Sequence, residues 1–412
     1  MAQSIRMAYG KMPIVIKVDP DVDLLTIREP ECQIDVRQFQ ERLTRFLQER
    51  SLDLTRTAVV VADKTRLCDY PIYLPILFDK LIEYGAPPQQ VSIYIAYGTH
   101  GRQSDAECRQ AYGAAYDRFH WVHHRCDELE LFEQLGRTRR GTPVRLRKDI
   151  MRASCLITFG AISHHYFAGY GGGRKLIFPG LGANTAIYAN HGLFLDHRMR
   201  DLAAGCRPGA LSGNPLAEDL DEVEAYRPAD MAIHGILDSR GRACDLLVGR
   251  GRECFQQACR QHARSCETAS RRQYDLVVAS CGGFPKDINF IQSHKAVHHA
   301  SAFVRDGGRL VVLTQCPDGI GSDTFLPWFD IGDWDTAFDR LSDRYVGNGG
   351  TALAMMAKTR RITIELVTDM DRAVARRIGV GTLSEAQLQN VLDRHQGPMA
   401  VIPNASMLVQ RP

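Results

Sequence analysis

Short apolar runs rich in valine and isoleucine recur along this sequence, each followed by a polar loop and then by a helical pattern. The first three runs cover residues 57–62, 91–96 and 155–159. Helices on both faces of a parallel sheet bury its strands, so such strands are continuously apolar instead of alternating. The pattern therefore predicts an α/β fold with mainly parallel sheets.

The same pattern restarts after a polar stretch at residues 267–273. Strands are predicted at 274–279, 309–314, 362–367 and 399–402, with a helix over 287–303. A chain of 412 residues is also too long for one ordinary hydrophobic core. We expect a first α/β domain over residues 1–270, a second over 271–401, and an active site in the cleft between them.

Composition excludes several classes of function. Lys and Arg number 51 against 48 Asp and Glu, and this net charge of +3 is scattered, so nucleic acid is not an expected partner. There is no run of 18 apolar residues, and residues 1–17 lack the features of a signal peptide. The 12 cysteines include no Cys-x-x-Cys pair. We expect a cytoplasmic protein with reduced thiols and no membrane association.

Polar loops follow the predicted strands of the first domain. They are Asp63-Lys64-Thr65-Arg66, Tyr97-Gly98-Thr99-His100, and a longer loop with His164, His165 and a glycine cluster that ends in Lys175. The carboxyl ends of parallel strands meet at one edge of a sheet, where open α/β folds bind ligands. The three loops are therefore predicted to converge on one site.

The loop over residues 164–175 has the most unusual composition. Glycines let backbone amides approach a phosphate, and Lys175 can supply a charge or an amine nucleophile. The alternative is a flexible loop with solvated basic residues, but the preceding strand and the histidine pair favour a binding site. Downstream, His191 is either structural or, with His100 and His165, a ligand of zinc, nickel or iron.

Two polar residues stand out in the second domain. Gln292 and Lys295 lie three residues apart on the predicted helix 287–303, and so share one face. This spacing fits an amide and a cation that bind a carboxylate. It fits a solvent-exposed polar face equally well.

In chain order, these pieces resemble the nickel-dependent lactate racemase family. The motifs are Asp63-x-x-Arg66, Tyr97-Gly-Thr-His100, His165-Tyr-Phe-Ala-Gly followed by Gly-Gly-Arg-Lys175, Asn190-His191, and Gln292-x-x-Lys295. The resemblance covers nearly the whole chain, and its most specific part is the block from His165 to Lys175.

The resemblance implies a cofactor, the nickel–pyridinium-3,5-bisthiocarboxylic acid mononucleotide, held covalently by Lys175 through a thioamide. It implies that His191 is a nickel ligand and that His100 and His165 are acid and base. It also implies two groups of binding residues: Asp63, Lys64, Thr65 and Arg66 for the cofactor, and Arg66, Gln292 and Lys295 for the substrate. Residues 402–412 are implied to return to the first domain, and cofactor-synthesis and nickel-insertion proteins are implied partners.

The implied activity is racemisation or epimerisation at C2 of a small-molecule 2-hydroxy acid, by removal and return of a hydride. Two histidines suit this reaction because the two enantiomers direct their hydroxyl groups to opposite sides, and imidazole exchanges protons near neutral pH. One alternative is a metal-dependent hydrolase or lyase that uses His100, His165 and His191. The other is a non-catalytic carrier of the nickel cofactor. The oligomeric state does not follow from the sequence.

The sequence departs from the family at the substrate pocket. Lactate racemases have a tryptophan late in the second domain that helps close the pocket, whereas no tryptophan follows Trp334 here. The corresponding segment, residues 345–351, is small and rich in glycine, so we expect a wider pocket. This favours a sugar acid such as gluconate over lactate, malate or an aromatic 2-hydroxy acid.

Overall fold

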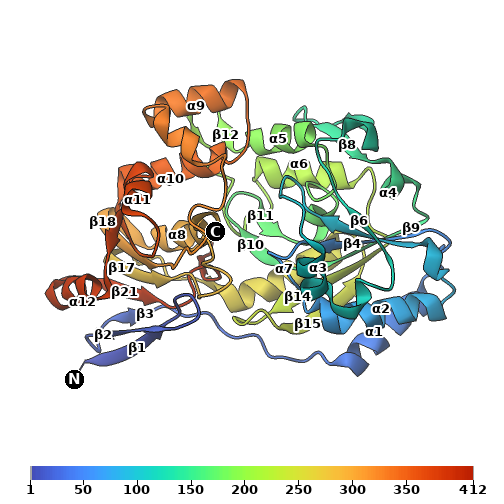
Figure 1. Cartoon of the computed structure of the whole chain (residues 1–412), viewed down its shortest axis with the longest axis horizontal. Coiled ribbons are helices and arrows are strands. Elements are labelled where there is room, and N and C mark those ends of the chain that lie inside the picture. The colour runs from blue at the N-terminus through green and yellow to red at the C-terminus, as the bar shows by residue number, and fades with distance from the viewer. Residues whose placement is uncertain (1, 412) are drawn as a thin grey trace.

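The structure is a computed structural model that describes residues 2–411, and it consists of two α/β domains side by side (Figure 1). The first domain is built on a six-stranded sheet. Its strands are, in spatial order, β15 (Ala243–Gly249), β14 (Met231–Leu237), β9 (Cys155–Ala161), β4 (Thr57–Ala62), β5 (Val91–Ala96) and β6 (His120–His123). All neighbours are parallel except β15, which returns antiparallel to β14.

The predicted strands at 57–62 and 91–96 are confirmed with the same bounds, and the third extends by two residues. Seven helices belong to this part of the chain: α1 (Val36–Glu49), α2 (Tyr70–Glu83), α3 (Asp105–Tyr112), α4 (Lys148–Arg152), α5 (Asn184–Gly192), α6 (Pro215–Glu224) and α7 (Gly251–Cys266). Smaller hairpins are formed by β7 (Phe132–Arg137) with β8 (Pro143–Arg147) and by β12 (Leu195–Asp196) with β13 (Asp201–Leu202). The edge pair of β14 and β15 was not predicted.

The second domain contains another six-stranded sheet, in which each pair of neighbours is parallel. The order is β20 (Gly381–Leu383), β19 (Thr363–Val367), β18 (Val304–Leu313), β17 (Tyr274–Ser280), β21 (Met399–Ile402) and β3 (Asp23–Leu24). Its helices are α8 (Phe290–Ser301), α9 (Trp334–Asp343), α10 (Gly349–Arg361), α11 (Arg372–Arg377) and α12 (Glu385–Arg394). Within residues 2–411, no helix is both long and apolar enough to cross a membrane.

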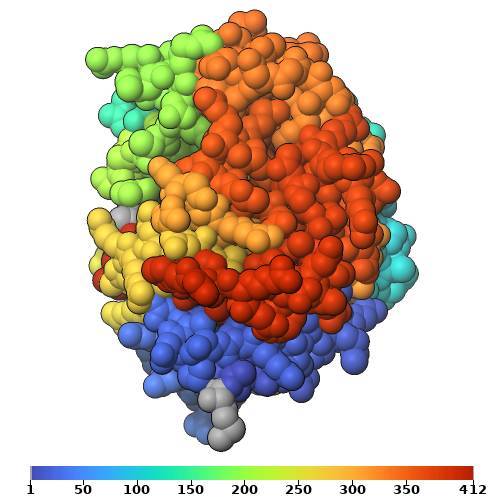
Figure 2. All heavy atoms as spheres, turned by 90° about the vertical axis from the view of Figure 1, so that its left-hand side faces the viewer, coloured from blue at the N-terminus to red at the C-terminus, as the bar shows by residue number. Residues whose placement is uncertain are grey.

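The first residues of the chain pack on the second domain, which corrects their predicted place in the first. β1 (Gln3–Met7) and β2 (Ile14–Val18) form a hairpin, and β3 extends the second sheet beside β21. Apolar side chains of the hairpin share one cluster with β17, β18 and β21. The hairpin accordingly lies near the red strand β21 in Figure 1, and blue N-terminal residues lie beside red C-terminal residues in Figure 2. β3 is only two residues long and its partner β21 is distant in the sequence, so no local sequence pattern indicates this strand.

The last residues return to the junction between the domains. β22 (Val409–Gln410) pairs in parallel with β16 (Glu267–Thr268), which directly follows α7. Ala405 and Leu408, however, pack in the core of the second domain. The division of the chain near residue 270, and the return of residues 402–412 to the first domain, stay predictions.

One disulfide departs from the expectation of reduced thiols. Cys32 and Cys244 are bonded, and the ten other cysteines within residues 2–411 are free. The two residues are 212 positions apart, so no spacing motif marks the pair. The bond joins the segment between the two domains to the edge strand β15 of the first sheet.

The corrected position of the hairpin is testable with two adjacent residues of β2. Ile16 is 2% exposed in the shared cluster, whereas Val15 points outward and is 54% exposed. Ile16→Ala should lower the free energy of unfolding of the second domain by roughly 2–5 kcal/mol, because it leaves a cavity. Val15→Ala should change it by less than about 0.5 kcal/mol. Urea unfolding followed by tryptophan fluorescence measures both, and equal effects would contradict the packing.

Candidate active site

Asp63 and His100 meet where the neighbouring strands β4 and β5 end. His100 Nδ1 lies 2.5 Å from Asp63 Oδ2, and Asp63 Oδ1 accepts hydrogen bonds from the Thr65 amide (2.9 Å) and hydroxyl (2.6 Å). Burial raises the pKa of Asp63, but the hydrogen bond to His100 and the charges of His100 and Arg66 outweigh it and hold the pKa below its ordinary value. Asp63 is therefore an ionised carboxylate that fixes the His100 ring through Nδ1.

Three further groups surround the buried ring of Phe167. Its centroid lies 4.5 Å from that of His165 and 5.2 Å from that of His191, and Lys175 Nζ is 5.7 Å away. His165 ends β10 (Ser163–His165), which pairs with β11 (Gly169–Gly171), and His191 is in the last turn of α5. Phe167 thus provides a shared apolar support for two imidazoles and an amine.

Both imidazoles are neutral at physiological pH. Burial lowers the pKa of His165 well below its ordinary value, and four nearby basic groups lower it further: Lys175, Arg66, His191 and Lys295. Burial, with the charge of Lys175, lowers the pKa of His191 to about 3. His165 Nδ1 accepts a hydrogen bond from the Ala168 amide at 3.2 Å, so its ring proton is on Nε2.

Lys175 has a pKa well below its ordinary value. Burial is the main cause, and the charges of Arg66, Arg174 and Lys295 add to it. A lowered pKa increases the neutral fraction of the amine, which is the nucleophilic form. The adjacent Arg174 serves a structural role instead, because its Nε lies 2.7 Å from Asp221 Oδ1.

The glycines before Lys175 are required by close packing. Gly172 and Gly173 have φ angles of +77° and +52°. A Cβ atom would lie 2.2 Å from the carbonyl oxygen of Ala161 at the first position and 2.5 Å from the Phe255 ring at the second. Backbone fit against β9 and α7 therefore accounts for both glycines. The glycine run is not by itself a sign of a phosphate site.

Helix α8 brings Gln292 and Lys295 from the second domain. Lys295 Nζ donates a hydrogen bond to Gln292 Oε1 at 2.9 Å. Burial, together with the charge of Arg66, lowers the pKa of Lys295 to about 7, although the nearby Asp63 opposes this shift. The charges that act on Lys295 place it beside the Asp63–Arg66 turn. Residues predicted from both halves of the sequence therefore lie near one another.

Tyr166 links the two domains at the same place. Its hydroxyl group lies 2.8 Å from Thr351 Oγ1 on α10, and its ring centroid lies 5.5 Å from His294 and 5.3 Å from His298 on α8. Tyr166 and Phe167 are both within the motif that begins at His165, but the sequence did not assign them a role. Their contacts depend on segments far apart in the chain.

One predicted site residue directs its side chain elsewhere. Lys64 forms an ion pair with Glu107 at the start of α3, and both side chains are largely exposed. The Lys64 backbone amide donates to Gln103 Oε1 at 2.9 Å. The neighbouring Thr65 holds Asp63, as described above. The Lys64 side chain is therefore engaged with Glu107 on α3.

Two glycines of the segment 345–351 are closely packed, so they leave no open space at their own positions. A Cβ atom at Gly349 would lie 2.4 Å from the Leu341 side chain, and one at Gly350 would lie 2.2 Å from the Tyr345 hydroxyl oxygen. The Tyr345 ring centroid is 6.0 Å from that of His191. Neighbouring side chains fill the space that glycine leaves, because α10 begins at Gly349 and lies against them.

The histidines do not form a compact metal site by themselves. Within residues 2–411, the one group of three His, Cys, Asp or Glu side chains with ligand atoms within 4.8 Å of one another is Cys32, Asp238 and Cys244. The structure therefore gives no support to the three-histidine site of a hydrolase or lyase. A single imidazole such as His191 suits a nickel ion whose other ligands come from a bound cofactor.

The chemistry of the cleft fits the nickel nucleotide that the resemblance implies. A neutral imidazole at His191 can ligate a metal, and the amine of Lys175 can form a covalent bond. Among the described residues, Arg66, Lys175 and Lys295 form no salt bridge with a carboxylate, and Arg66 lies close enough to both lysines to lower their pKa values. Such unpaired cations favour anionic ligands, as a phosphate or carboxylate would be.

Two family profiles match the chain, described as the lactate racemase N-terminal domain over residues 9–202 and the lactate racemase C-terminal domain over residues 269–343. The lactate racemase of Thermoanaerobacterium thermosaccharolyticum is 28% identical over 339 residues, which cover 79% of this chain and 78% of that protein. The lactate racemase of Lactiplantibacillus plantarum is 27% identical over 283 residues, which cover 68% and 64%.

Solved structures have the same fold. The lactate racemase apoprotein of Thermoanaerobacterium thermosaccharolyticum matches with a TM-score of 0.87 at 22% identity, over 100% of both chains. A protein from Thermotoga maritima matches with a TM-score of 0.70 at 14% identity, over 93% of this chain and 99% of that one. Since both domain profiles match in order and the fold is shared throughout, the chain belongs to the lactate racemase family and is accordingly an isomerase.

Proposed function

We propose that this protein racemises or epimerises a 2-hydroxy acid at C2 by removal and return of a hydride. The observation that carries the proposal is the composition of the cleft. Neutral imidazoles, an amine of lowered pKa and two unpaired cations are drawn from both domains to one place. Covalent attachment of a cofactor requires an unprotonated amine, and the lowered pKa of Lys175 favours that form.

His100 and His165 act as the acid and the base. Asp63 holds His100 through Nδ1, and the Ala168 amide holds His165 through Nδ1. In each ring Nε2 is the atom left to exchange a proton with the substrate hydroxyl. One histidine serves each enantiomer, because the hydroxyl groups of the two enantiomers point to opposite sides.

Lys295, Gln292 and Arg66 bind the substrate carboxylate. The hydrogen bond between Lys295 and Gln292 orients the ammonium and amide groups together. Charge-assisted hydrogen bonds from a cation to a carboxylate are stronger than neutral ones, and they fix the position of C2 between the two histidines.

Lys175 and His191 hold the nickel-pincer nucleotide, Lys175 through a thioamide and His191 as a nickel ligand. When bound, this cofactor supplies the acceptor and donor of the hydride. Asp63, Thr65 and Arg66 border it, and Lys64 contributes only its main chain, since its side chain pairs with Glu107. The proposal requires cofactor-synthesis and nickel-insertion proteins as partners, and it places the enzyme in the cytoplasm.

The substrate we propose is a short 2-hydroxy acid such as lactate. Both similar curated proteins are lactate racemases. The expectation of a sugar acid such as gluconate depended on open space at the glycines of segment 345–351. Their packing against Leu341 and Tyr345 removes that argument.

Replacement of Lys175 tests the attachment of the cofactor. Lys175→Ala should abolish both the added cofactor mass and the activity, and Lys175→Arg should do the same because a guanidinium group cannot form the thioamide. Protein produced together with the cofactor-synthesis proteins is examined by intact mass and by lactate racemisation. Lys64→Ala is the control and should retain the mass. Full activity of Lys175→Ala would refute the pincer mechanism.

Replacement of the three histidines should have two different effects, loss of turnover or loss of nickel. His100→Ala and His165→Ala should each lower kcat by about 10²–10⁴-fold, the usual contribution of a proton-transfer group, while nickel stays bound. His191→Ala should lose nickel. Elemental analysis of the purified variants beside their kcat values measures the difference. The same nickel loss in all three variants would show that these roles are wrongly divided.

Substrate binding should depend on pH through Lys295, whose pKa is lowered to about 7. Below that pH the ammonium group is charged and attracts the carboxylate. As the pH rises through about 7 the charge is lost, so KM for lactate should increase. Lys295→Arg keeps its charge and should show a flat KM over the same range. A pH-dependent KM that persists in Lys295→Arg would assign the titration to another group.

A further inference from the structure

The ring of Tyr166 stacks on the ring of His165, one of the two histidines proposed as acid and base. Their centroids lie 5.4 Å apart, and their planes differ by 13°. Phe167 packs edge-to-face against both rings, with its centroid 4.5 Å from each. The imidazole is therefore oriented by aromatic packing as well as by the hydrogen bond from the Ala168 amide.

The second domain holds Tyr166 in turn. Its hydroxyl group shares a hydrogen bond of 2.8 Å with Thr351 in the first turn of α10, and its ring lies 5.5 Å from His294 and 5.3 Å from His298, between centroids. Burial, with the charge of Lys358, lowers the pKa of both histidines well below its ordinary value. Neutral rings of α8 therefore pack against the tyrosine.

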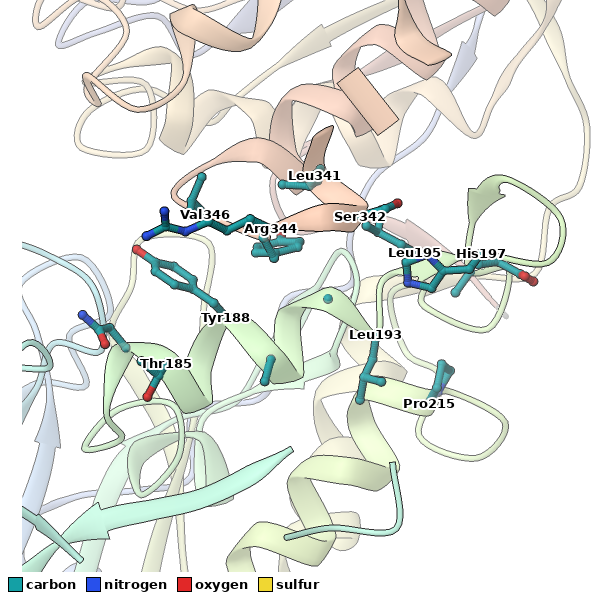
Figure 3. A pocket seen from close by; sticks show the side chains of 16 residues that line it. Thr185, Tyr188, Leu193, Leu195, His197, Pro215, Leu341, Ser342, Arg344 and Val346 are labelled. Carbon is teal, nitrogen blue, oxygen red and sulfur yellow. The ribbon is translucent and has the colours of Figure 1, made fainter. Parts of the chain in front are cut away.

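The two domains do not pack closely along their whole boundary. A groove of about 750 Å³ lies between α5 of the first domain and the end of α9 in the second. Tyr188 lines one side of it, and Leu341 and Val346 line the other (Figure 3). Individual contacts, such as that of Tyr166 with Thr351, therefore have a larger share in fixing one domain relative to the other.

We propose that Tyr166 is a positioning residue for His165. The inference rests on the proposed function, and it adds a residue on which the acid–base step depends. In that function Gln292 and Lys295 of α8 bind the substrate carboxylate, and the same helix packs against Tyr166. Tyr166 thus sets the distance from the imidazole to the carboxylate site, and so holds His165 Nε2 at the substrate hydroxyl group.

Loss of this link should lower turnover and leave substrate binding unchanged. Tyr166→Phe and Thr351→Val each remove one hydroxyl group of the hydrogen bond. Each should lower kcat for lactate by about 10-fold, since a shift of roughly 1 Å in a reacting group costs up to about 10²-fold. KM should not change, because Gln292 and Lys295 are intact. Thr351→Ser keeps a hydroxyl group and should recover most of the kcat that Thr351→Val loses.

A double-mutant cycle tests whether the two residues act together. Tyr166→Phe combined with Thr351→Val should have the same kcat as either single variant, because one broken hydrogen bond accounts for all three losses. Tyr188→Phe is the matched control, since it removes a tyrosine hydroxyl group from the groove at the same boundary, and it should keep the native kcat. Native kcat in both single variants, losses that multiply in the double variant, or an equal loss in Tyr188→Phe would overturn the inference.

The link is also measurable without cofactor or substrate. NMR of the full-length protein with isotope-labelled histidine gives the ring signals of His165, which are identified by their loss in His165→Gln. Tyr166→Leu removes the stacked ring and should shift these signals strongly, and Thr351→Val should shift them by a smaller amount. Unchanged His165 signals in both variants would overturn the inference. A chain that shows both shifts but racemises no 2-hydroxy acid would instead refute the proposed function.

Discussion

The candidate active site depends on positive charge that is concentrated among half-buried side chains. Arg66, Lys175 and Lys295 come from a turn, a short 3-10 helix and an α-helix, and the charge of Arg66 adds to the cost of keeping either buried lysine charged. Asp63 is already bound to His100. Burial lowers the pKa of both lysines, and the positive charge of Arg66 lowers it further. The same positive charges favour the binding of an anion such as a carboxylate or phosphate.

The fold keeps these positively charged groups close together because each of them is attached to a rigid element of the structure. The parallel strands before Asp63, His100 and His165 are almost completely buried, and their register brings the three loops together. The ring of Phe167 then supports the groups on the loop and on α5. Tyr166 and Thr351 tie the second domain to the first, which sets the distance from Lys295 to the first-domain residues.

The features that were predicted correctly are those that a local sequence pattern determines. Buried apolar runs identified strands, and residues directly after them, such as Asp63 and His100, were correctly expected at one edge. The helix with Gln292 and Lys295 was recognised because three-residue spacing sets a common face. Contacts between distant segments left no such pattern, which is why β3, the Cys32–Cys244 bond and the position of Tyr345 were missed. The ion pair of Lys64 with Glu107 was not expected, because a motif does not reveal the partner of its side chain.

The position of β3 has a consequence for how the protein is made. During synthesis on the ribosome, residues 23–24 emerge long before their partner strand β21. The first sheet contains no residue from the N-terminal hairpin, so it can assemble while translation continues. The hairpin must meanwhile remain without the surface that covers its apolar face. Completion of the second sheet therefore has to wait until β21 has been synthesised.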